Sequence, residues 1–577
     1  MRLRRATRDL WIPAGLALLV AGGWGLERAE SFGRIREAFR APAVPAAVLN
    51  RGSVGRALRR LKLVVPIRND GRVFPPSAHP KAALDASLFQ KKRKVGESLY
   101  APNREWVRDL AEQGGLSPPS VPPDAFREGW PLIAVQIDEG DLYGDKWGIV
   151  ANHWGRGREW ERPASVAYYV DGQRVFSTLA GLRLHGGQSR KPGQTHSFRV
   201  HFREEYGASE FPRGLVFGPE CEPIRRLVVH ADWPEAFPFA GLLAFDAAER
   251  VGCAVPRTQP VLFALNGELQ PGLHWLSEHV GRAAWANRIG HRDFLMYVMK
   301  GQKENESFRA YGGFHLRLLA APAPLDLAAI EREVDLDNLS AYTLAMAYGG
   351  TSDGYQGAAW MDPRAERPRW AWINWDMDHS FWDVYGDPGQ RKPWQKESWE
   401  RALVRPGDRR YADWKAQGDA RSVLFTRLMD ECPAYRRRFL RYAADMLNHR
   451  LTESFMLERV AHYERLARTF GRTDLAFAED YREFVRRRPE VLREGLRQWF
   501  GVGEFHRVEV RAPEGAALRI DGFEEASPYA GWYFDGQTVE VESSGEPAAW
   551  RVNGEPAAAG PRLARAVDRD LSIDAAP

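Results

Sequence analysis

The sequence predicts an α+β protein, because three regions of the chain differ in the spacing of their apolar residues. From Trp130 to about residue 280, short β-branched and aromatic runs are separated by Gly, Pro and Asn, a pattern typical of strands. From Val423 to Phe500, apolar residues recur at helical spacing, with an arginine-rich outer face expected. From Phe505 they alternate, as in Val508 and Val510, which indicates a small β-sandwich.

Length and composition indicate a globular protein of two to four domains. The chain has 577 residues, of which 44% are hydrophobic and 27% charged, and these values exclude a largely disordered chain. The net charge of +5 is small and the basic residues are spread, so no nucleic-acid partner is expected. Cys221, Cys253 and Cys432 show neither CxxC pairing nor zinc-like spacing, which excludes a disulfide framework and leaves one bridge open.

The N-terminus has the pattern of a targeting segment. Four arginines within the first eight residues precede an uncharged run from Leu10 to Leu26. We expect residues 1–29 to form a cytoplasmic basic segment and a single membrane anchor, which would place the rest of the chain outside the cytoplasm. The alternative is secretion after signal cleavage, for which Ala21-Gly22-Gly23 is the best site.

Composition also divides the rest of the chain. Residues 30–129 are charged and irregular and end in a proline-rich linker at 118–123. We expect a core domain over residues 130–503 and a small all-β domain over residues 504–577.

Strands and tight turns are predicted early in the core domain. Leu132–Ile137, Gly148–Val150 and Val166–Val170 are apolar runs of strand type. Asp171-Gly172 and Asn266-Gly267 are strong hairpin signals, because both residues of a type I′ turn need positive φ.

A glycine-rich turn, Gly186-Gly187, is predicted to follow a strand, with Ser189 and Arg190 just beyond it and another strand from Ser197 to Arg203. Backbone N–H groups in such a turn can approach phosphate oxygens, and Ser189 or Arg190 could add donors. A plain hairpin turn is the alternative interpretation.

A helix is predicted from Asp335 to Tyr348. Asp335 is an N-cap residue, and Gly349-Gly350 ends the helix. Asp353 follows on a loop, where functional residues concentrate.

The most informative stretch is Trp370–Asp383. It opens as a buried strand, and Asp376 and Asp378 then follow among aromatic residues. In a strand these two side chains would share one face, and a cation such as Mg²⁺ would offset their repulsion. Capping of the next turn, or pairing with arginines, is the structural alternative.

Several of these blocks resemble the CotH family of atypical kinases, named for a spore-coat protein. The matching blocks occur in the family's order over about residues 130–503: Leu182–Arg190, Ser197–Phe202, Leu265–Glu268 with Leu273–His279, Asp335–Leu339 with Asp353, and Trp375–Phe381. The resemblance implies a two-lobed, kinase-like fold with a mixed or antiparallel N-lobe sheet and a helical C-lobe. It also implies ATP and a divalent metal, Mg²⁺ or Mn²⁺.

The resemblance also implies residue roles. Asp353 matches the catalytic-loop aspartate that accepts the proton of the substrate hydroxyl. Asp376 matches the metal-binding aspartate, with Asp378 beside it and Gln356 as a further ligand. The implied nucleotide-binding residues are Gly186, Gly187, Ser189, Arg190, His196, Arg199 and Glu278.

Two departures from the family pattern bear on activity. Relatives commonly carry lysine where this chain has His196, and histidine, with a pKa near ~6.5, is mostly neutral at pH 7. Arg199 or Arg190 would then have to bind the phosphates. Relatives also tend to place asparagine a few residues after the Asp353 position, where only Gln356 could substitute.

Three functions therefore follow as hypotheses. The first is a membrane-anchored, extracytoplasmic kinase that phosphorylates Ser or Thr of a cell-surface protein. The second is a pseudokinase that acts as a surface scaffold. The third is a carbohydrate-active hydrolase with paired carboxylates.

Overall fold

The computed structural model describes residues 118–145, 148–191, 195–232, 235–298, 306–351, 357–382, 392–396, 398–403, 421–513, 516–543 and 549–576. They belong to two compact units. In the described part, the first unit comprises residues 139–161 and 191, with the short helices α7 (Glu139–Tyr143) and η3 (Arg158–Trp160). The second unit contains all the other described residues.

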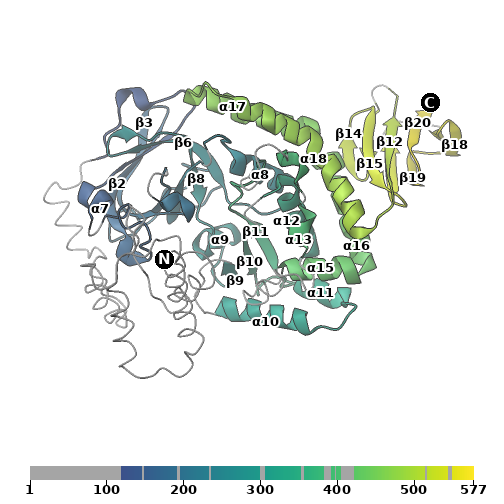
Figure 1. The fold of residues 1–577 in the computed structure, drawn as a ribbon, viewed down its shortest axis with the longest axis horizontal. Helices are drawn as coiled ribbons and strands as arrows, with labels where there is room; N and C mark the ends of the chain where they lie inside the picture. The colour runs from purple at the N-terminus through teal and green to yellow at the C-terminus, as the bar shows by residue number, and fades with distance from the viewer. Residues whose placement is uncertain are drawn as a thin grey trace, which may run out of the picture. The chain divides into compact units, whose positions relative to one another are not determined.

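The first part of the second unit is a closed β-barrel of seven strands (Figure 1). Its strands are β1 (Leu132–Gln136), β2 (Arg162–Val170), β3 (Gln173–Leu184), β4 (Phe198–His201), β5 (Arg226–Ala231), β8 (His274–Glu278) and β6 (Thr258–Leu265). Neighbours pair antiparallel in that order, and β6 then pairs parallel with β1, with Leu132 opposite Leu262. The short β7 (Glu268–Leu269) extends β6 through the predicted Asn266-Gly267 hairpin, which is confirmed.

The barrel differs from the kinase-like N-lobe sheet that the resemblance implied. The sheet is mixed, as expected, but it closes on itself, because β1 finds partners on both sides and leaves neither edge open. The apolar run of β1 is buried along its length, as expected for a strand covered on both faces.

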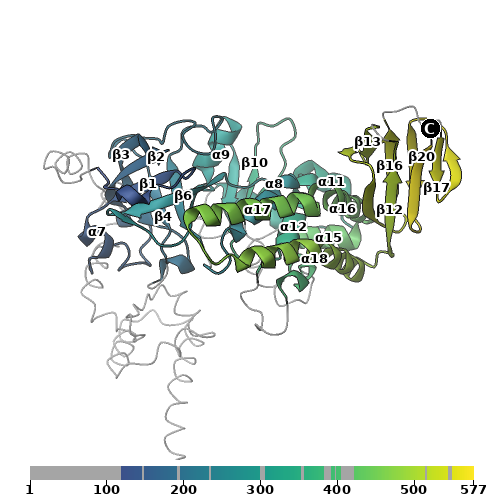
Figure 2. The ribbon, with the colours of Figure 1, turned by 90° about the horizontal axis from the view of Figure 1, so that it is seen from above.

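Helices and a three-stranded sheet form the next part. The sheet has the order β11 (Ala371–Asn374), β10 (Gly357–Met361), β9 (Leu295–Val298). The helices are α8 (Ala240–Arg250), α9 (Arg282–Ile289), α10 (Glu306–Ala320), α11 (Leu327–Glu333), α12 (Leu336–Gly349), α13 (Trp399–Ala402), α15 (Arg421–Glu431), α16 (Pro433–Asp445), α17 (Glu453–Phe470) and α18 (Ala476–Phe500). α17 and α18 lie side by side (Figure 2).

α12 is the central helix of this part. All its residues from Leu339 to Gly349 are buried, and a helix that is apolar all round belongs inside a core. It contacts α8, α16 and α18, whose apolar residues join the same hydrophobic core. The predicted N-cap is confirmed, because the Asp335 carboxylate accepts a hydrogen bond from the backbone N–H of Asn338 at 3.0 Å.

The C-terminal strands form the predicted sandwich of two sheets around one core. One sheet contains β15 (Tyr529–Phe534), β12 (Phe505–Arg511), β20 (Leu571–Ala576), β17 (Ala549–Val552) and β18 (Glu555–Ala558). The other contains β14 (Phe523–Glu525), β13 (Leu518–Ile520), β16 (Thr538–Ser543) and β19 (Arg562–Ala566). The alternating residues Val508 and Val510 are both fully buried, as their period-two spacing predicted.

Two local predictions were wrong. Gly148–Val150 is a turn and not a strand, because the Gly148 N–H bonds to the nearby Gly144 carbonyl at 2.7 Å. The arginines of the helical region do not all face outward, because Arg421 and Arg488 are buried among polar partners.

The three cysteines are buried free thiols. Among the described residues, no helix is long and apolar enough to cross a membrane, and the predicted anchor at residues 10–26 lies outside them.

Candidate functional site

The two predicted acidic ligands lie on a tight turn rather than on a strand. β11 ends at Asn374, and Asp376 has φ +58°, in the left-handed region. A turn follows, in which the Ser380 N–H bonds to the Met377 carbonyl at 3.1 Å. Asp376 is exposed and Asp378 is half-buried. The expectation that both side chains share one strand face was therefore wrong, since the left-handed residue breaks the strand geometry.

Packing fixes this acidic turn between two helices. The Phe381 N–H bonds to the Gly349 carbonyl at the end of α12 at 2.9 Å. On the other side, a Cβ on Gly241 in α8 would come within 3.4 Å of the Asp378 backbone nitrogen. The first is a backbone hydrogen bond and the second is a close approach of two backbones, so the position of the turn depends on the helices and not on flexible side chains.

The end of α12 is held by a buried arginine of α18. Nε of Arg488 donates to the Tyr348 carbonyl at 3.0 Å, and Nη2 donates to the Ala347 carbonyl at 2.5 Å. Last-turn carbonyls lack the full set of bonds that a helix interior provides, and the Ala347 carbonyl also accepts the N–H of the C-cap residue Gly350 at 3.2 Å. The guanidinium thus fixes the helix end that contacts the acidic turn.

Asp353 and Gln356 lie outside the described residues. The described residues on both sides of their segment contact the acidic turn or β11. Gly349 bonds to Phe381, as above, and Gly357 is paired with Asn374, two residues before Asp376. The described residues that flank the segment, Gly349 before it and Gly357 after it, are therefore bonded to the acidic turn and to β11.

Two buried polar side chains next to the turn were missed from the sequence. Asn374 and Ser380 are fully buried, and their side chains make no hydrogen bond with the residues that the structure describes. An unsatisfied buried amide or hydroxyl is costly, so such groups are typical of sites that bind a ligand, water or ion. No sequence signal separates them from ordinary strand-end polar residues.

The donor set at the turn suits a hard cation. Asp376 and Asp378 offer carboxylate oxygens, and Asn374 offers an amide oxygen, the ligand types that Mg²⁺ and Mn²⁺ accept. Among the described residues, no group of three or more His, Cys, Asp or Glu side chains could hold a metal alone. The residues present therefore fit an ion that keeps waters or substrate oxygens as further ligands.

The glycine-rich turn is confirmed as a turn that requires glycine at one position. Gly186 has φ +91°, and a Cβ there would overlap Oγ of Ser189. Gly187 is exposed. The turn continues into the short helix η4 (Gln188–Arg190).

His196 and Arg190 both bond to the backbone of this turn. Nδ1 of His196 lies 2.9 Å from the Ser189 carbonyl. The buried Arg190 guanidinium donates to the Leu184 carbonyl at the end of β3. These bonds brace the turn, so in this conformation neither side chain replaces the lysine of relatives.

Arg199, on β4, is held by a neutral histidine. Its Nη2 lies 2.7 Å from Nδ1 of His185, which precedes Gly186. Burial and the Arg199 charge hold the pKa of His185 well below its usual range, so Nδ1 accepts the hydrogen bond. Arg199 is thus the cation fixed beside the glycine turn.

Glu278 is the last residue of β8, and among the described residues its carboxylate pairs with arginines outside this turn. Its buried carboxylate contacts two arginines, Arg288 at 2.5 Å and Arg257 at 3.6 Å, and it accepts the Arg257 backbone N–H at 3.0 Å. Every one of these contacts is structural. The structure therefore groups Gly186, Ser189, Arg190, His196 and Arg199 in one place, and Asp376 and Asp378 in another.

Comparison with known proteins adds one match. Residues 325–498 match the family model described as CotH kinase protein. No curated protein matches the chain. The match covers less than a third of the chain, but it contains α12, the acidic turn and Arg488. The resemblance to CotH kinases that the motifs indicated is thus confirmed for residues 325–498, the segment that carries both predicted catalytic blocks.

Proposed function

We propose that this protein is a kinase that transfers the γ-phosphoryl group of ATP to a serine or threonine hydroxyl of a cell-surface protein. The match of residues 325–498 to CotH kinase proteins supports the reaction class. The single observation that carries the proposal is the left-handed, exposed Asp376 on a turn fixed by two helices within that matched segment. Strained backbone of this kind concentrates at functional sites.

Each candidate residue has a role in this proposal. Asp376 and Asp378, with Gln356, would hold Mg²⁺ or Mn²⁺, which neutralises phosphate charge when bound. Asp353 would accept the proton of the attacking hydroxyl while the bond from the γ-phosphorus to ADP breaks. The barrel and the helical part would correspond to the two lobes of a kinase.

The glycine turn would bind the phosphates of ATP. Gly186 and Gly187 allow the backbone to approach an anion closely, and Ser189 adds a hydroxyl. Arg199 would supply the positive charge that lysine supplies in relatives, because the guanidinium stays charged at any physiological pH. Glu278 would act through the position of β8 and not by contact with nucleotide.

A pseudokinase is the second candidate, and one observation favours it. His196 stands at the lysine position and bonds to the Ser189 carbonyl, so it offers no fixed cation to a phosphate. A protein of this kind would bind nucleotide or metal without transferring a phosphoryl group.

The proposed location is outside the cytoplasm. The four early arginines and the run from Leu10 to Leu26 support a single N-terminal anchor, with secretion after cleavage as the alternative.

The test is phosphoryl transfer by the full-length protein with γ-labelled ATP and Mg²⁺ or Mn²⁺. Asp376→Asn removes the charge and keeps a residue that tolerates a left-handed backbone. Asp171→Asn is the matched control, because Asp171 is also exposed with φ +49° but lies in a barrel hairpin. We expect Asp376→Asn and Asp353→Ala to lower incorporation by ~100-fold or more, and Asp171→Asn to leave it unchanged.

Thermal shift with nucleotide separates the remaining outcomes. A metal-dependent shift without incorporation would support the pseudokinase. Neither a shift nor incorporation would exclude nucleotide binding, and release of sugars from a glycan panel would then support the hydrolase.

A further inference from the structure

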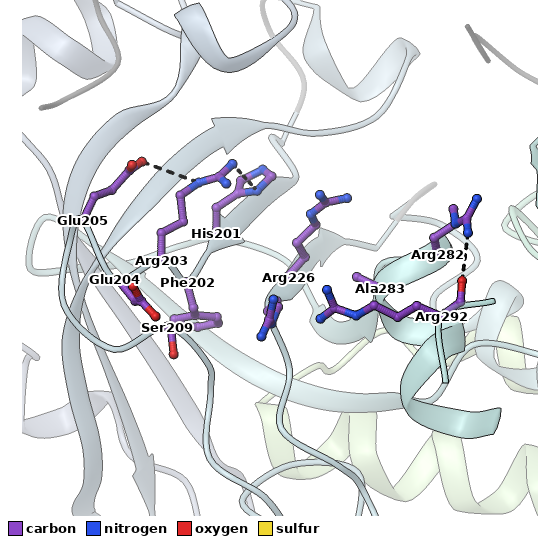
Figure 3. Close-up of a pocket in the computed structure, with 11 residues that line it drawn as sticks. His201, Phe202, Arg203, Glu204, Glu205, Ser209, Arg226, Arg282, Ala283 and Arg292 are labelled. Atoms are coloured by element: carbon purple, nitrogen blue, oxygen red, sulfur yellow. Dashed lines mark hydrogen bonds and ion pairs between the residues drawn. The ribbon is translucent and has the colours of Figure 1, made fainter. Parts of the chain in front are cut away.

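A second candidate binding site lies on the barrel part, formed by residues that the proposed kinase reaction does not use. It is a pocket of about 620 Å³, lined where β4 ends, where β5 begins, at the start of α9 and just before β9. Five of its eleven lining residues are arginines: Arg203, Arg225, Arg226, Arg282 and Arg292. In Figure 3, Arg226 lies between Arg203 on one side and Arg282 and Arg292 on the other.

Only part of this positive charge is neutralised within the protein. Arg225 forms a 2.7 Å ion pair with Glu210, and Arg203 lies 3.9 Å from Glu205. Arg282 and Arg292 pair with no carboxylate of the described residues. Against five arginines the lining itself contains only Glu204 and Glu205, so the pocket is positive overall.

Two contacts orient Arg282, one of the two arginines without carboxylate partners among the described residues. Nη2 of Arg282 donates to the Arg292 carbonyl at 2.8 Å, and its guanidinium lies over the Phe294 ring at 5.3 Å. Arg282 is therefore positioned by a carbonyl and an aromatic face, neither of which cancels its charge.

The start of α9 adds backbone donors to the same pocket. Arg282 and Ala283 are its first residues, and Gly281 provides no side-chain cap. The first-turn N–H groups of a helix carry partial positive charge and bind anions.

A buried histidine reports the same positive field. Burial is the main cause of the lowered pKa of His201, and the nearby Arg183, Arg199, Arg203 and Arg226 charges lower it further. The His201 imidazole in the pocket wall is therefore neutral, and the positive charge of the pocket comes from the arginines.

We propose that this pocket binds a ligand that carries at least one phosphate group. One arginine fork suffices for a carboxylate, whereas guanidinium groups from separate segments together with helix N–H groups suit the several oxygens of a phosphate. At about 620 Å³ the pocket is larger than inorganic phosphate, so it has room for the rest of a phosphorylated polypeptide side chain or of a small phosphate ester. The site is independent of the proposed transfer reaction.

Binding to the full-length protein by calorimetry tests this assignment. The probes are pyrophosphate, a phosphoserine peptide and its unphosphorylated counterpart. Arg292→Gln is the first variant, because Arg292 is exposed and its side chain has no contact among the described residues that folding would need. The control is Arg332→Gln, which removes an exposed arginine of α11 away from the pocket.

We expect pyrophosphate or the phosphopeptide to bind, with affinity that falls as salt rises, and Arg292→Gln to weaken binding by ~10-fold or more. Arg332→Gln should bind as the parent does. The probe that binds identifies the source of the phosphate, and binding of the unphosphorylated peptide alone would overturn the assignment. So would no binding by either phosphate probe, or equal binding by Arg292→Gln and the parent. Arg292→Gln should also label its substrate normally if the kinase proposal holds, and Asp376→Asn should still bind pyrophosphate, so the two proposals fail separately.

Discussion

Asp376 differs from the other acidic and amide residues with positive φ. Asp171, Asn266, Asp521 and Asn553 each precede a glycine that also has positive φ, as a tight hairpin turn requires. Asp376 precedes the buried Met377 and belongs to no hairpin. Since turn geometry does not explain its conformation, a functional constraint on the carboxylate is the better explanation.

The sequence accounts for hairpin residues but not for Asp376. An Asp-Gly or Asn-Gly pair carries its own local reason for positive φ. The turn that carries Asp376 is positioned by the packing of α8 and α12, and no local pattern encodes such contacts between distant segments. The alternation of Asp376 and Asp378 therefore suggested that the strand continues through both residues, whereas β11 ends at Asn374, two residues before Asp376.

Replacement of Glu278 tests whether this residue, predicted to bind nucleotide, instead stabilises the fold. Its carboxylate is 6% exposed and pairs with Arg257 and Arg288. We expect Glu278→Gln to lower the free energy of unfolding by roughly 2 to 3 kcal/mol, because two guanidinium groups lose their counter-charge. Urea unfolding without nucleotide measures this.

Glu268→Gln is the control for Glu278→Gln, because Glu268 is an exposed residue of the adjacent hairpin. It should change stability by less than about 0.5 kcal/mol. Equal stability of Glu278→Gln and the parent, with weaker nucleotide binding, would restore the cofactor role.

At the scale of elements, α12 connects the core to the candidate site. Its N-terminus is capped by Asp335, and Asn338 in its first turn bonds to both backbone groups of Trp372, with distances of 2.6 and 3.0 Å. The helix thus supports the edge of β11 that faces away from β10, where Ala254 also forms a parallel bridge with Ile373. Its C-terminus is held by Arg488.

The sequence predicted α12 closely and Arg488 not at all. An acidic N-cap and a terminal glycine pair are local signals, and the helix occupies Leu336–Gly349 against the expected Asp335–Tyr348. Arg488 ends a run of three arginines that suggested a solvated face. Arg488 differs from its two neighbouring arginines because it donates to the carbonyls at the end of α12. Those carbonyls come close to it only in the folded chain, so the sequence contains no signal of its role.

Arg488→Lys is therefore expected to destabilise the protein by roughly 3 to 5 kcal/mol, because an ammonium cannot reproduce the planar fork. Besides α12, the guanidinium bonds to the Trp394 and Lys396 carbonyls at 2.9 and 2.6 Å. Thermal unfolding measures the loss.

Arg487→Lys is the matched control on the same helix. Arg487 is exposed over the Trp394 ring at 6.0 Å, and its replacement should cost less than about 0.5 kcal/mol. Similar losses from both variants would show that Arg488 has no special part in holding α12.

At the scale of the whole molecule, the spacing of apolar residues predicted that sheets are present but did not predict that one of them closes into a barrel. Leu132–Ile137 was predicted as a strand, but its parallel pairing with β6 joins segments far apart in sequence. Alternation reports which face of a strand is buried and contains no information on which strand closes a barrel. The kinase resemblance implied a mixed or antiparallel sheet, which is observed as a mixed sheet, but it did not imply that the sheet closes on itself.

A buried polar cluster links the helical part to the C-terminal sandwich. His449, in the π-turn after α16, stacks between the rings of Phe523 and Tyr529 at 4.6 and 5.3 Å. Its Nδ1 lies 2.7 Å from Glu525 and its Nε2 lies 3.7 Å from Asp521. Burial alone would lower the pKa of His449, but the two carboxylates outweigh burial and raise it.

Nearby Asp445 acts in the same direction. Burial, with repulsion from Asp521, raises the pKa of Asp445 to about 7, and Arg441 opposes this at 3.8 Å. Its ionisation near neutral pH therefore costs stability, as does loss of the proton from His449 at higher pH.

We expect the free energy of unfolding to fall as pH rises through the raised folded-state pKa values of Asp445, at about 7, and of His449, above its usual 6.5. A raised pKa means that the folded state holds its proton above pH 6.5, so the stability that His449 contributes is lost as pH passes its folded-state value. The loss is about 1.4 kcal/mol for each tenfold difference in proton affinity between the folded and unfolded states. The buried histidines with lowered pKa values, such as His230 and His274, act in the opposite direction, because only their unfolded forms still hold some protons near pH 7. Their effect ends by about pH 8 and does not produce a fall. Urea unfolding at constant ionic strength should give a falling profile for the parent and a flatter one for His449→Gln.

His506→Gln, in the same sandwich, should keep the parent's slope. Parallel profiles for His449→Gln and the parent would mean that pH acts on stability elsewhere, and that the junction is held by ring stacking alone.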